Sequence, residues 1–336
     1  MKKKSLAAIS AVLLATTLFA SCTSASQKLS FSPNWAQNTL GNTGAITGEE
    51  VLEYEVNFTD ATGFNEEYYS VLYCPEKSGK YVTTLKNNSS GDGYIYTTRL
   101  ELDVQFAIGS AVEVFTDVVE TEMEFKSTLN ALQPVRSEKT VLSHTPRNVD
   151  ATTFEAAYVD YDYTVLTEYD GECNAAVVTY TDRKGTLLSG KDLPRTSTKT
   201  FEIDKEKYTY LDNEQLLFAV RGLSSTYLSS QRIVNIYDAY TSALQEVKLN
   251  AESKDSEKFS FSINGTPLAA DTVVEYTPVK LSLNATNAGA AITAWYATTT
   301  DPSNNVYRNA MLYMETAVSY NIGSLRYSLK NAQFAN

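Results

Sequence analysis

Acidic side chains recur at alternate positions, where two carboxylates could act together. Glu120, Glu122 and Glu124 form one series, and Asp160 with Asp162 forms another. Glycoside hydrolases use two carboxyl groups about 5 Å or about 6.5–9.5 Å apart, spacings that alternate strand positions can meet. The solvated face of a strand in an acidic protein produces the same pattern, and this is the simpler interpretation. We therefore predict no hydrolase site from these residues.

A second motif, Gly222-Leu223-Ser224-Ser225-Thr226, begins like a nucleophile elbow but lacks the closing glycine. The elbow also requires a strand before the serine and a histidine later in the chain. A predicted helix precedes this serine, and the single histidine, His144, lies upstream in a predicted loop beside Pro146. The sequence also lacks an EF-hand loop and a glycine-rich phosphate loop. We expect no catalytic residue, no metal site and no cofactor, and hence not an enzyme.

The composition excludes further classes of protein. The chain has 336 residues, of which 43% are hydrophobic, so it can form a large core and is neither disordered nor collagen-like. It carries 28 basic and 40 acidic residues, a net charge of -12. Nucleic-acid binding needs a basic surface, so we expect no nucleic-acid partner. The sequence identifies no protein partner.

The N-terminus predicts export and a lipid anchor. Lys2, Lys3 and Lys4 form a basic region, and an apolar stretch from 6 to 20 follows that is too short to span a membrane. It ends in Leu18-Phe19-Ala20-Ser21-Cys22, which resembles the bacterial lipobox, although Phe19 replaces the usual aliphatic residue. We predict a signal peptide over 1–21 and acylation of Cys22. Ordinary signal cleavage that leaves Cys22 free is the alternative.

The predicted anchor places the protein in the bacterial cell envelope, on the exterior or periplasmic side of a membrane. Residues 22–48 are mostly Ser, Thr, Asn, Gln and Gly, which predicts a flexible tether. The region 49–336 shows no change in composition and predicts a single domain. Its two cysteines, Cys74 and Cys173, could form one disulfide in an oxidising compartment or remain two buried thiols.

Alternating apolar residues predict that this domain is mostly β. Leu52, Tyr54, Val56 and Phe58 alternate with polar residues, as in a half-buried strand. Similar runs recur along the chain, at 69–73, 94–96, 100–106, 122–126, 158–166, 175–180, 201–210, 233–237, 244–249, 259–263, 273–283, 292–297, 311–318 and 325–329. Turn signals separate several of them, most clearly Asn264-Gly265. The pattern predicts a large curved antiparallel sheet or half-barrel.

One short helix is predicted within this sheet protein. Asp212 is a good N-cap, with Gln215 three residues later and Gly222 as a stop. A helix is about 10 Å across and adjacent strands are about 4.8 Å apart, so this helix covers two or three strands. The rest of the apolar face needs another cover, which could be the curled sheet, a second sheet or an apolar ligand.

Three segments of the chain resemble one known family. The run from Tyr210 to Arg221 looks like its Asp-led helix, and 119–136 is similar to its strand-turn element ending in Pro-x-Arg. The stretch from Gly289 to Leu329, with Trp295-Tyr296, resembles its last three strands. The family is numbered 3108 among domains of unknown function, and the resemblance runs from about Leu52 to Phe334. It implies the curved sheet and short helix of LolA/LolB-like lipoprotein carriers, and it assigns no functional residue.

These features predict a non-enzymatic exported lipoprotein that binds a lipid or another hydrophobic ligand in a concave sheet. The predicted ligand face combines helix and strand residues, which are equally good candidates for the core: Leu216, Leu217, Val220, Tyr54, Phe58, Leu102, Phe106, Phe125 and Trp295. The alternative is a structural cell-surface lipoprotein, or one that binds glycans or a partner, with a closed core. The 23 tyrosines motivate this alternative, because exposed tyrosines can stack on sugars.

Overall fold

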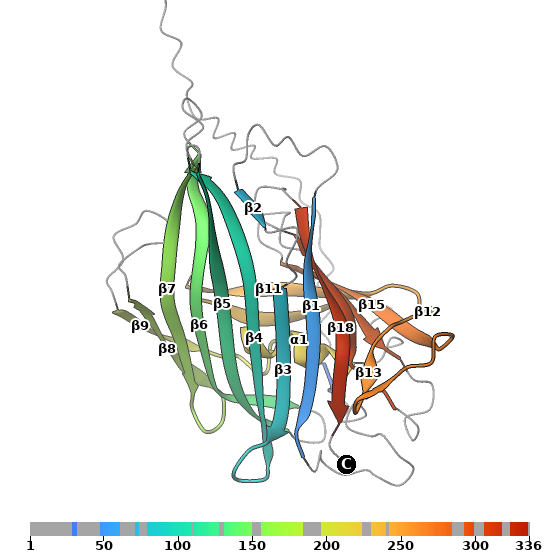
Figure 1. Ribbon diagram of the computed structural model, residues 1–336. Helices are drawn as coiled ribbons and strands as arrows, with labels where there is room; N and C mark the ends of the chain where they lie inside the picture. Colours follow the sequence, from blue (N-terminus) through green and yellow to red (C-terminus); the bar gives the residue numbers. More distant parts are fainter. Residues whose placement is uncertain are drawn as a thin grey trace, which may run out of the picture.

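The structure, a computed structural model, describes most of the predicted domain and four residues before it. The described residues are 29–31, 48–60, 71–73, 79–108, 111–127, 131–149, 156–183, 196–223, 230–239, 242–283, 292–298, 306–317 and 323–334. They form an 18-stranded sheet (Figure 1). Its strands are β1 (Glu50–Asp60), β2 (Val71–Tyr73), β3 (Gly79–Asn87), β4 (Gly93–Ile108), β5 (Ala111–Ser127), β6 (Leu132–Val149), β7 (Ala156–Tyr169), β8 (Ala175–Asp182), β9 (Thr196–Glu202), β10 (Arg232–Asp238), β11 (Ala243–Ala251), β12 (Asp255–Lys258), β13 (Ser262–Ile263), β14 (Thr266–Pro267), β15 (Val273–Leu283), β16 (Ile292–Ala297), β17 (Met311–Ala317) and β18 (Gly323–Phe334).

The strands pair in one continuous antiparallel series. From one end to the other the order is β9-β8-β7-β6-β5-β4-β3-β1-β18-β17-β16-β15-β11-β10. The shorter strands add to this series, and β13 pairs with β18 in parallel. The predicted fold class, a large antiparallel sheet with one short helix, is confirmed.

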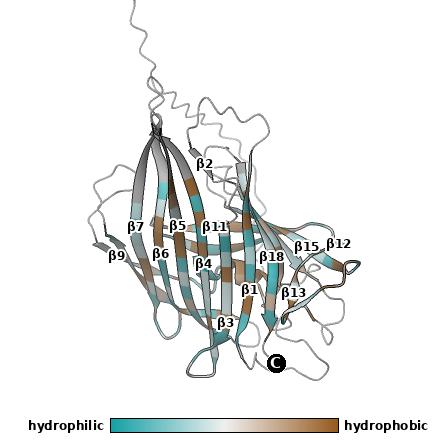
Figure 2. Ribbon diagram, viewed as in Figure 1, coloured by the Kyte–Doolittle hydropathy of each residue, from teal (hydrophilic) through white to brown (hydrophobic). Residues whose placement is uncertain are grey.

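Alternation of residue type fixes which side of each strand is buried. Figure 2 shows apolar and polar residues alternating along strands such as β1 and β5. In β1, Leu52, Tyr54 and Val56 are buried while Glu53 and Glu55 are only partly covered. Because successive strand side chains point to opposite faces, this one-sided pattern gives the sheet an apolar inner face and a polar outer face.

The helical segment that the structure describes lies against this inner face. It consists of a 3₁₀ turn, η3 (Asn213–Gln215), and helix α1 (Leu216–Val220). The Phe218 ring lies 5.1 Å from the ring of Tyr96 in β4 and 5.1 Å from that of Phe125 in β5. From β16, the Tyr296 hydroxyl donates to the Leu217 carbonyl at 2.8 Å. Residues from distant strands therefore meet on α1. The sheet curls around the helix, and the apolar surfaces of the two pack against each other.

The helix begins and ends where the sequence indicates. Asp212 is the N-cap, and its carboxylate accepts the Glu214 backbone N–H at 2.8 Å. Gln215 does not complete a capping box, because its side chain is buried and donates to the Leu132 carbonyl at 3.3 Å. The predicted Asn264-Gly265 turn is also confirmed: both residues have positive φ, as a two-residue hairpin turn requires.

The stretch predicted to be a flexible tether contains a docked segment. Leu29 and Phe31 are 6% and 4% exposed and belong to the main core. The Leu29 N–H donates to the Thr209 hydroxyl at 2.9 Å. The rest of 22–48 lies outside the described residues, apart from 48. The prediction of a flexible tether is therefore wrong for 29–31. The burial of two apolar side chains outweighs the entropy that these three residues lose when they become ordered.

Replacing both Leu29 and Phe31 by Ala is expected to lower the free energy of unfolding by about 2 kcal/mol. Burying such side chains is worth about 1.5–3 kcal/mol each, and ordering the segment offsets part of this. Urea unfolding of a soluble chain that begins at Thr23 measures the difference. A Leu244→Ala variant is the control, since Leu244 is 36% exposed. Equal stabilities of the two variants would contradict docking.

Candidate functional site

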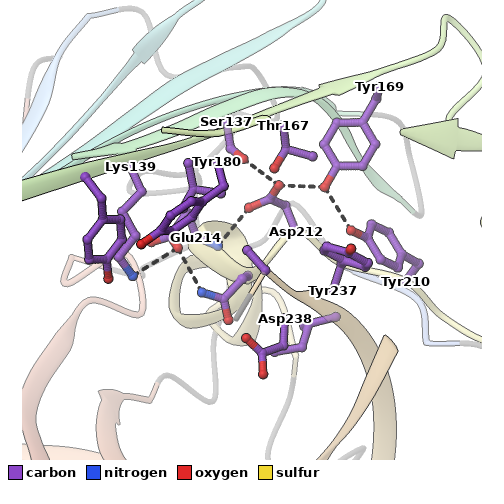
Figure 3. Close-up of a pocket in the computed structure, with 15 residues that line it drawn as sticks. Ser137, Lys139, Thr167, Tyr169, Tyr180, Tyr210, Asp212, Glu214, Tyr237 and Asp238 are labelled. Carbon is purple, nitrogen blue, oxygen red and sulfur yellow. Dashed lines mark hydrogen bonds and ion pairs between the residues drawn. The ribbon is translucent and has the colours of Figure 1, made fainter. Parts of the chain in front are cut away.

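A cavity of about 250 Å³ lies beside the N-terminal end of the helical segment. Figure 3 shows the side chains that surround it. Its lining combines tyrosines, acidic residues and one lysine with a few small or apolar groups: Ser137, Lys139, Tyr163, Val165, Thr167, Tyr169, Tyr180, Tyr210, Asp212, Asn213, Glu214, Ile236, Tyr237, Asp238 and Ala239. This is the polar, aromatic type of lining that orients a small ligand by hydrogen bonds.

Three adjacent strands supply one wall. Lys139 of β6 is opposite Val165 of β7, which is opposite Tyr180 of β8. Directly paired residues of neighbouring strands share a face, so these side chains point together into the sheet's concave side. The opposite wall comes from the segment between β9 and η3 and from the end of β10. The cavity therefore lies where the two ends of the sheet approach each other.

A buried carboxylate organises the floor of the cavity. Asp212 Oδ2 accepts hydrogen bonds from the Ser137 hydroxyl at 2.7 Å and from the Tyr169 hydroxyl at 2.6 Å. Tyr169 in turn shares a hydrogen bond of 2.9 Å with the Tyr210 hydroxyl. Burial raises the pKa of the Asp212 carboxyl despite these donors. Asp212 thus caps the helix and orients two tyrosines at once.

A lysine–glutamate pair and two stacked tyrosines form the side of the cavity. Lys139 Nζ lies 3.2 Å from Glu214 Oε1, and the Glu214 charge raises the pKa of Lys139. The rings of Tyr163 and Tyr180 stack with centroids 5.3 Å apart. Burial raises the pKa of both hydroxyls, so they remain protonated donors at neutral pH. The wall therefore offers aromatic surface next to hydrogen-bonding groups.

The two ends of the sheet, β9 and β10, meet through side chains and one short backbone contact. Tyr210 and Asn235 form an isolated parallel bridge. The rings of Phe201 in β9 and Tyr237 in β10 stack at 4.1 Å with an interplanar angle of 4°. Tyr237 belongs to a second, smaller core that also contains Cys173 and Val178, and Phe201 packs against this core. The cavity lies against this join, so its shape depends on the join staying closed.

The structure places the predicted ligand face in the protein core. Leu216, Val220, Tyr54, Leu102 and Phe125 are buried members of the main core, and Leu217, Phe58 and Trp295 pack against it. Phe106 belongs to β4, but its side chain lies outside the described set. None of these residues lines the cavity described above. The packing favours their other interpretation, as core residues.

The other candidates lie elsewhere. Glu120 forms an ion pair with Arg99 and Glu122 lies 3.5 Å from Arg136, all on exposed side chains, as expected for a solvated strand face. His144 is in β6, and the expectation of a loop is wrong: its Nδ1 lies 2.9 Å from Asp117 Oδ1, and its ring stacks on Phe115 at 4.5 Å. In the part of the chain that the structure describes, no group of three His, Cys, Asp or Glu could hold a metal ion.

The three cysteines of the sequence are only partly covered by the described residues. Within the described part of the chain, Cys173 is a buried thiol with no disulfide partner. Cys74 and Cys22 lie outside the described residues, as do the signal peptide and most of the tether. Neither described helical segment has the length and apolar run that a membrane crossing requires.

The Asp212 carboxyl is expected to make stability depend on pH. Its pKa in the folded protein lies above its unfolded value of about 3.9, so its contribution is largest below that value. The contribution is lost as the pH rises through the folded pKa. Urea unfolding of the wild type and of Asp212→Asn measures this effect. The free energy of unfolding of the wild type, relative to that of the variant, should fall as the pH rises from 4. The opposite trend would mean that the Ser137 and Tyr169 hydrogen bonds outweigh burial.

The fold and the site define a mostly β domain whose curled antiparallel sheet encloses one short helix beside a small cavity lined by aromatic, apolar and polar side chains. No protein-family model and no curated protein matches the chain, so the resemblance to the family numbered 3108 has no support from a family match. Among solved structures, the chain is similar to a β-barrel-like protein of domain of unknown function DUF1849 from Brucella abortus. The two share 10% identity, with a TM-score of 0.49 over 86% of this chain and 98% of that chain. At this level of similarity nothing about function follows.

Proposed function

We propose that this protein is a non-enzymatic, lipid-anchored binding protein of the bacterial cell envelope whose tyrosine-lined cavity takes a small hydroxylated ligand, such as one sugar unit. The cavity beside Asp212 supports this proposal most directly, because its lining presents aromatic rings together with hydroxyl, carboxylate and amine groups. A sugar has the matching surfaces, an apolar ring face and a rim of hydroxyls that both donate and accept.

The size of the cavity favours this ligand over an acyl chain. Its volume of about 250 Å³ lies just below the range of about 300–1,000 Å³ usual for sites that bury drug-sized ligands. The resemblance to lipoprotein carriers would favour a lipid, but the apolar inner face around α1 packs into the core. The glycan-binding alternative is therefore the better supported of the two functions expected from the sequence.

A non-enzymatic role agrees with the use of the buried carboxylate. Both oxygens of Asp212 accept hydrogen bonds from the protein itself, from Ser137, Tyr169 and the Glu214 backbone. A carboxylate engaged in this way positions its neighbours and has little capacity left for proton transfer to a ligand. Hydrolysis of chromogenic glycosides by the purified protein would contradict this part of the proposal.

The ligand proposal can be tested with a soluble chain that begins at Thr23. Isothermal titration calorimetry with a panel of monosaccharides is expected to detect binding, and fluorescent fatty acids are expected not to bind. A Tyr180→Ala variant removes one wall of the cavity and should abolish sugar binding. A Tyr313→Ala variant is the control, because Tyr313 packs against the main core and does not line the cavity. Fatty-acid binding without sugar binding would overturn the proposal.

The anchor needs a separate test. Expression of the full chain in a bacterium with labelled fatty acid is expected to label the protein at Cys22 and to place it in the membrane fraction. Cys22→Ser should lose the label and leave the membrane fraction. Retention of the variant in the membrane without a label would show that something other than the lipid attaches the protein.

A further inference from the structure

The charges around the cavity narrow the class of ligand. Three carboxylates, Asp212, Glu214 and Asp238, face it, whereas Lys139 is the one cationic side chain among its described lining residues. Lys139 is already engaged with Glu214. Besides burial, the charges of Lys139, Glu214 and Asp238 all act on the Tyr163 hydroxyl and shift its pKa, so the three groups lie within electrostatic range of the same wall. Acidic groups therefore outnumber basic ones by three to one among the lining residues that the structure describes.

The hydrogen-bond directions on the cavity floor add further acceptors. Tyr169 donates its proton to Asp212, so its oxygen must accept the proton of Tyr210. Burial raises the pKa of both tyrosines, which keeps both hydroxyls protonated. Both protons thus point toward Asp212, and the Tyr210 oxygen presents lone pairs. At this part of the floor the hydroxyl protons of Tyr169 and Tyr210 are already donated within the protein, so the Tyr210 oxygen acts as an acceptor.

We propose that the cavity selects a sugar that carries a positively charged amine and rejects acidic sugars, an inference that rests on the proposed sugar-binding function. The ammonium group would lie near Asp238 and Glu214, next to the tyrosine faces, where cation–π attraction adds to the charge pairing. Hydroxyl groups of the same ring would donate to the Tyr210 oxygen. A carboxylate on the ligand would be repelled by these acidic side chains. The charge of Lys139 would not offset this repulsion, because Lys139 is paired with Glu214.

Calorimetric titration with three sugars that differ in one substituent separates this inference from the general function. Glucosamine in its protonated form is expected to bind at least tenfold more tightly than glucose, and glucuronate more weakly than glucose. Equal affinities for glucosamine and glucose would overturn the charge preference while the sugar site survives. Binding of none of the three would overturn the proposed function as well.

Two variants test the residues responsible. Asp238→Asn is expected to reduce the preference for glucosamine over glucose to below threefold. Glu214→Gln releases the charge of Lys139 into the cavity and should reverse the order, so that glucuronate binds more tightly than glucosamine. Glu257→Gln makes the same charge change on exposed strand β12 and should leave all three affinities unchanged. An unaltered preference in both cavity variants would overturn the assignment.

Discussion

An Arg221→Met variant is expected to lose about 3–5 kcal/mol of unfolding free energy, because the change leaves the Glu50 carboxylate buried without its partner. Arg221 Nη1 lies 2.6 Å from Glu50 Oε1, with side-chain exposures of 4% and 2%. Its Nη2 donates to Glu50 Oε2 at 3.2 Å and to the Arg308 carbonyl at 2.8 Å. Removal of one member of such a buried pair is among the costliest single changes.

Urea unfolding of two further variants makes this expectation specific. Arg326→Met breaks an ion pair with Glu315 whose side chains are 54% and 35% exposed, and it should cost less than about 1 kcal/mol. Glu50→Leu combined with Arg221→Met removes both charges and should recover much of the stability lost in the single variant. An Arg221→Met variant as stable as Arg326→Met would contradict the cost assigned to a buried Glu50 without its ion-pair partner.

This ion pair also bears on the cavity. It fixes the C-terminal end of the helical segment to β1, while Asp212 and Gln215 hold the N-terminal end to β6, β7 and the Leu132 carbonyl. A short helix has little stability of its own and depends on such tertiary contacts. Because Asp212 and Glu214 are cavity residues, the two fixed ends hold the binding groups in place before a ligand arrives.

Local patterns in the sequence predict those elements whose residues alternate or cap. The alternation in β1 and β15, the Asp212 cap and the Asn264-Gly265 turn all depend on neighbouring residues, and all are confirmed. Strand β6 was not predicted, because Pro134 and Pro146 interrupt its pattern, although the ladder shifts register beside both and accommodates them. Strand β3 also lacks a strong apolar alternation beyond Tyr81 and Leu85.

The cavity could not be predicted in the same way, because its contacts join residues far apart in the chain. Ser137 and Asp212 are 75 positions apart, and Tyr169 and Asp212 are 43 apart. The sequence predicts Asp212 as a helix cap, which is correct but is half of its role. An apolar residue on the inner face of a strand can contact either a ligand or another core residue, and its type does not distinguish the two.

Replacement of Phe218 tests whether the residues around α1 form a protein core or a ligand-binding face. Its side chain is 2% exposed and packs between Tyr96 and Phe125, with Arg221 5.6 Å above its ring. Phe218→Ala is therefore expected to cost about 3–5 kcal/mol in the free energy of unfolding, measured by urea titration. Leu217→Ala on the same helix should cost less, because Leu217 is only partly buried.

The space left by Phe218 is apolar, so the Phe218→Ala variant should gain binding of a small apolar molecule such as benzene, which the wild type is expected not to bind. If the wild type instead binds fatty acids, and Phe218→Ala abolishes that binding at a cost below about 1 kcal/mol, the residues around α1 form a lipid site rather than a core.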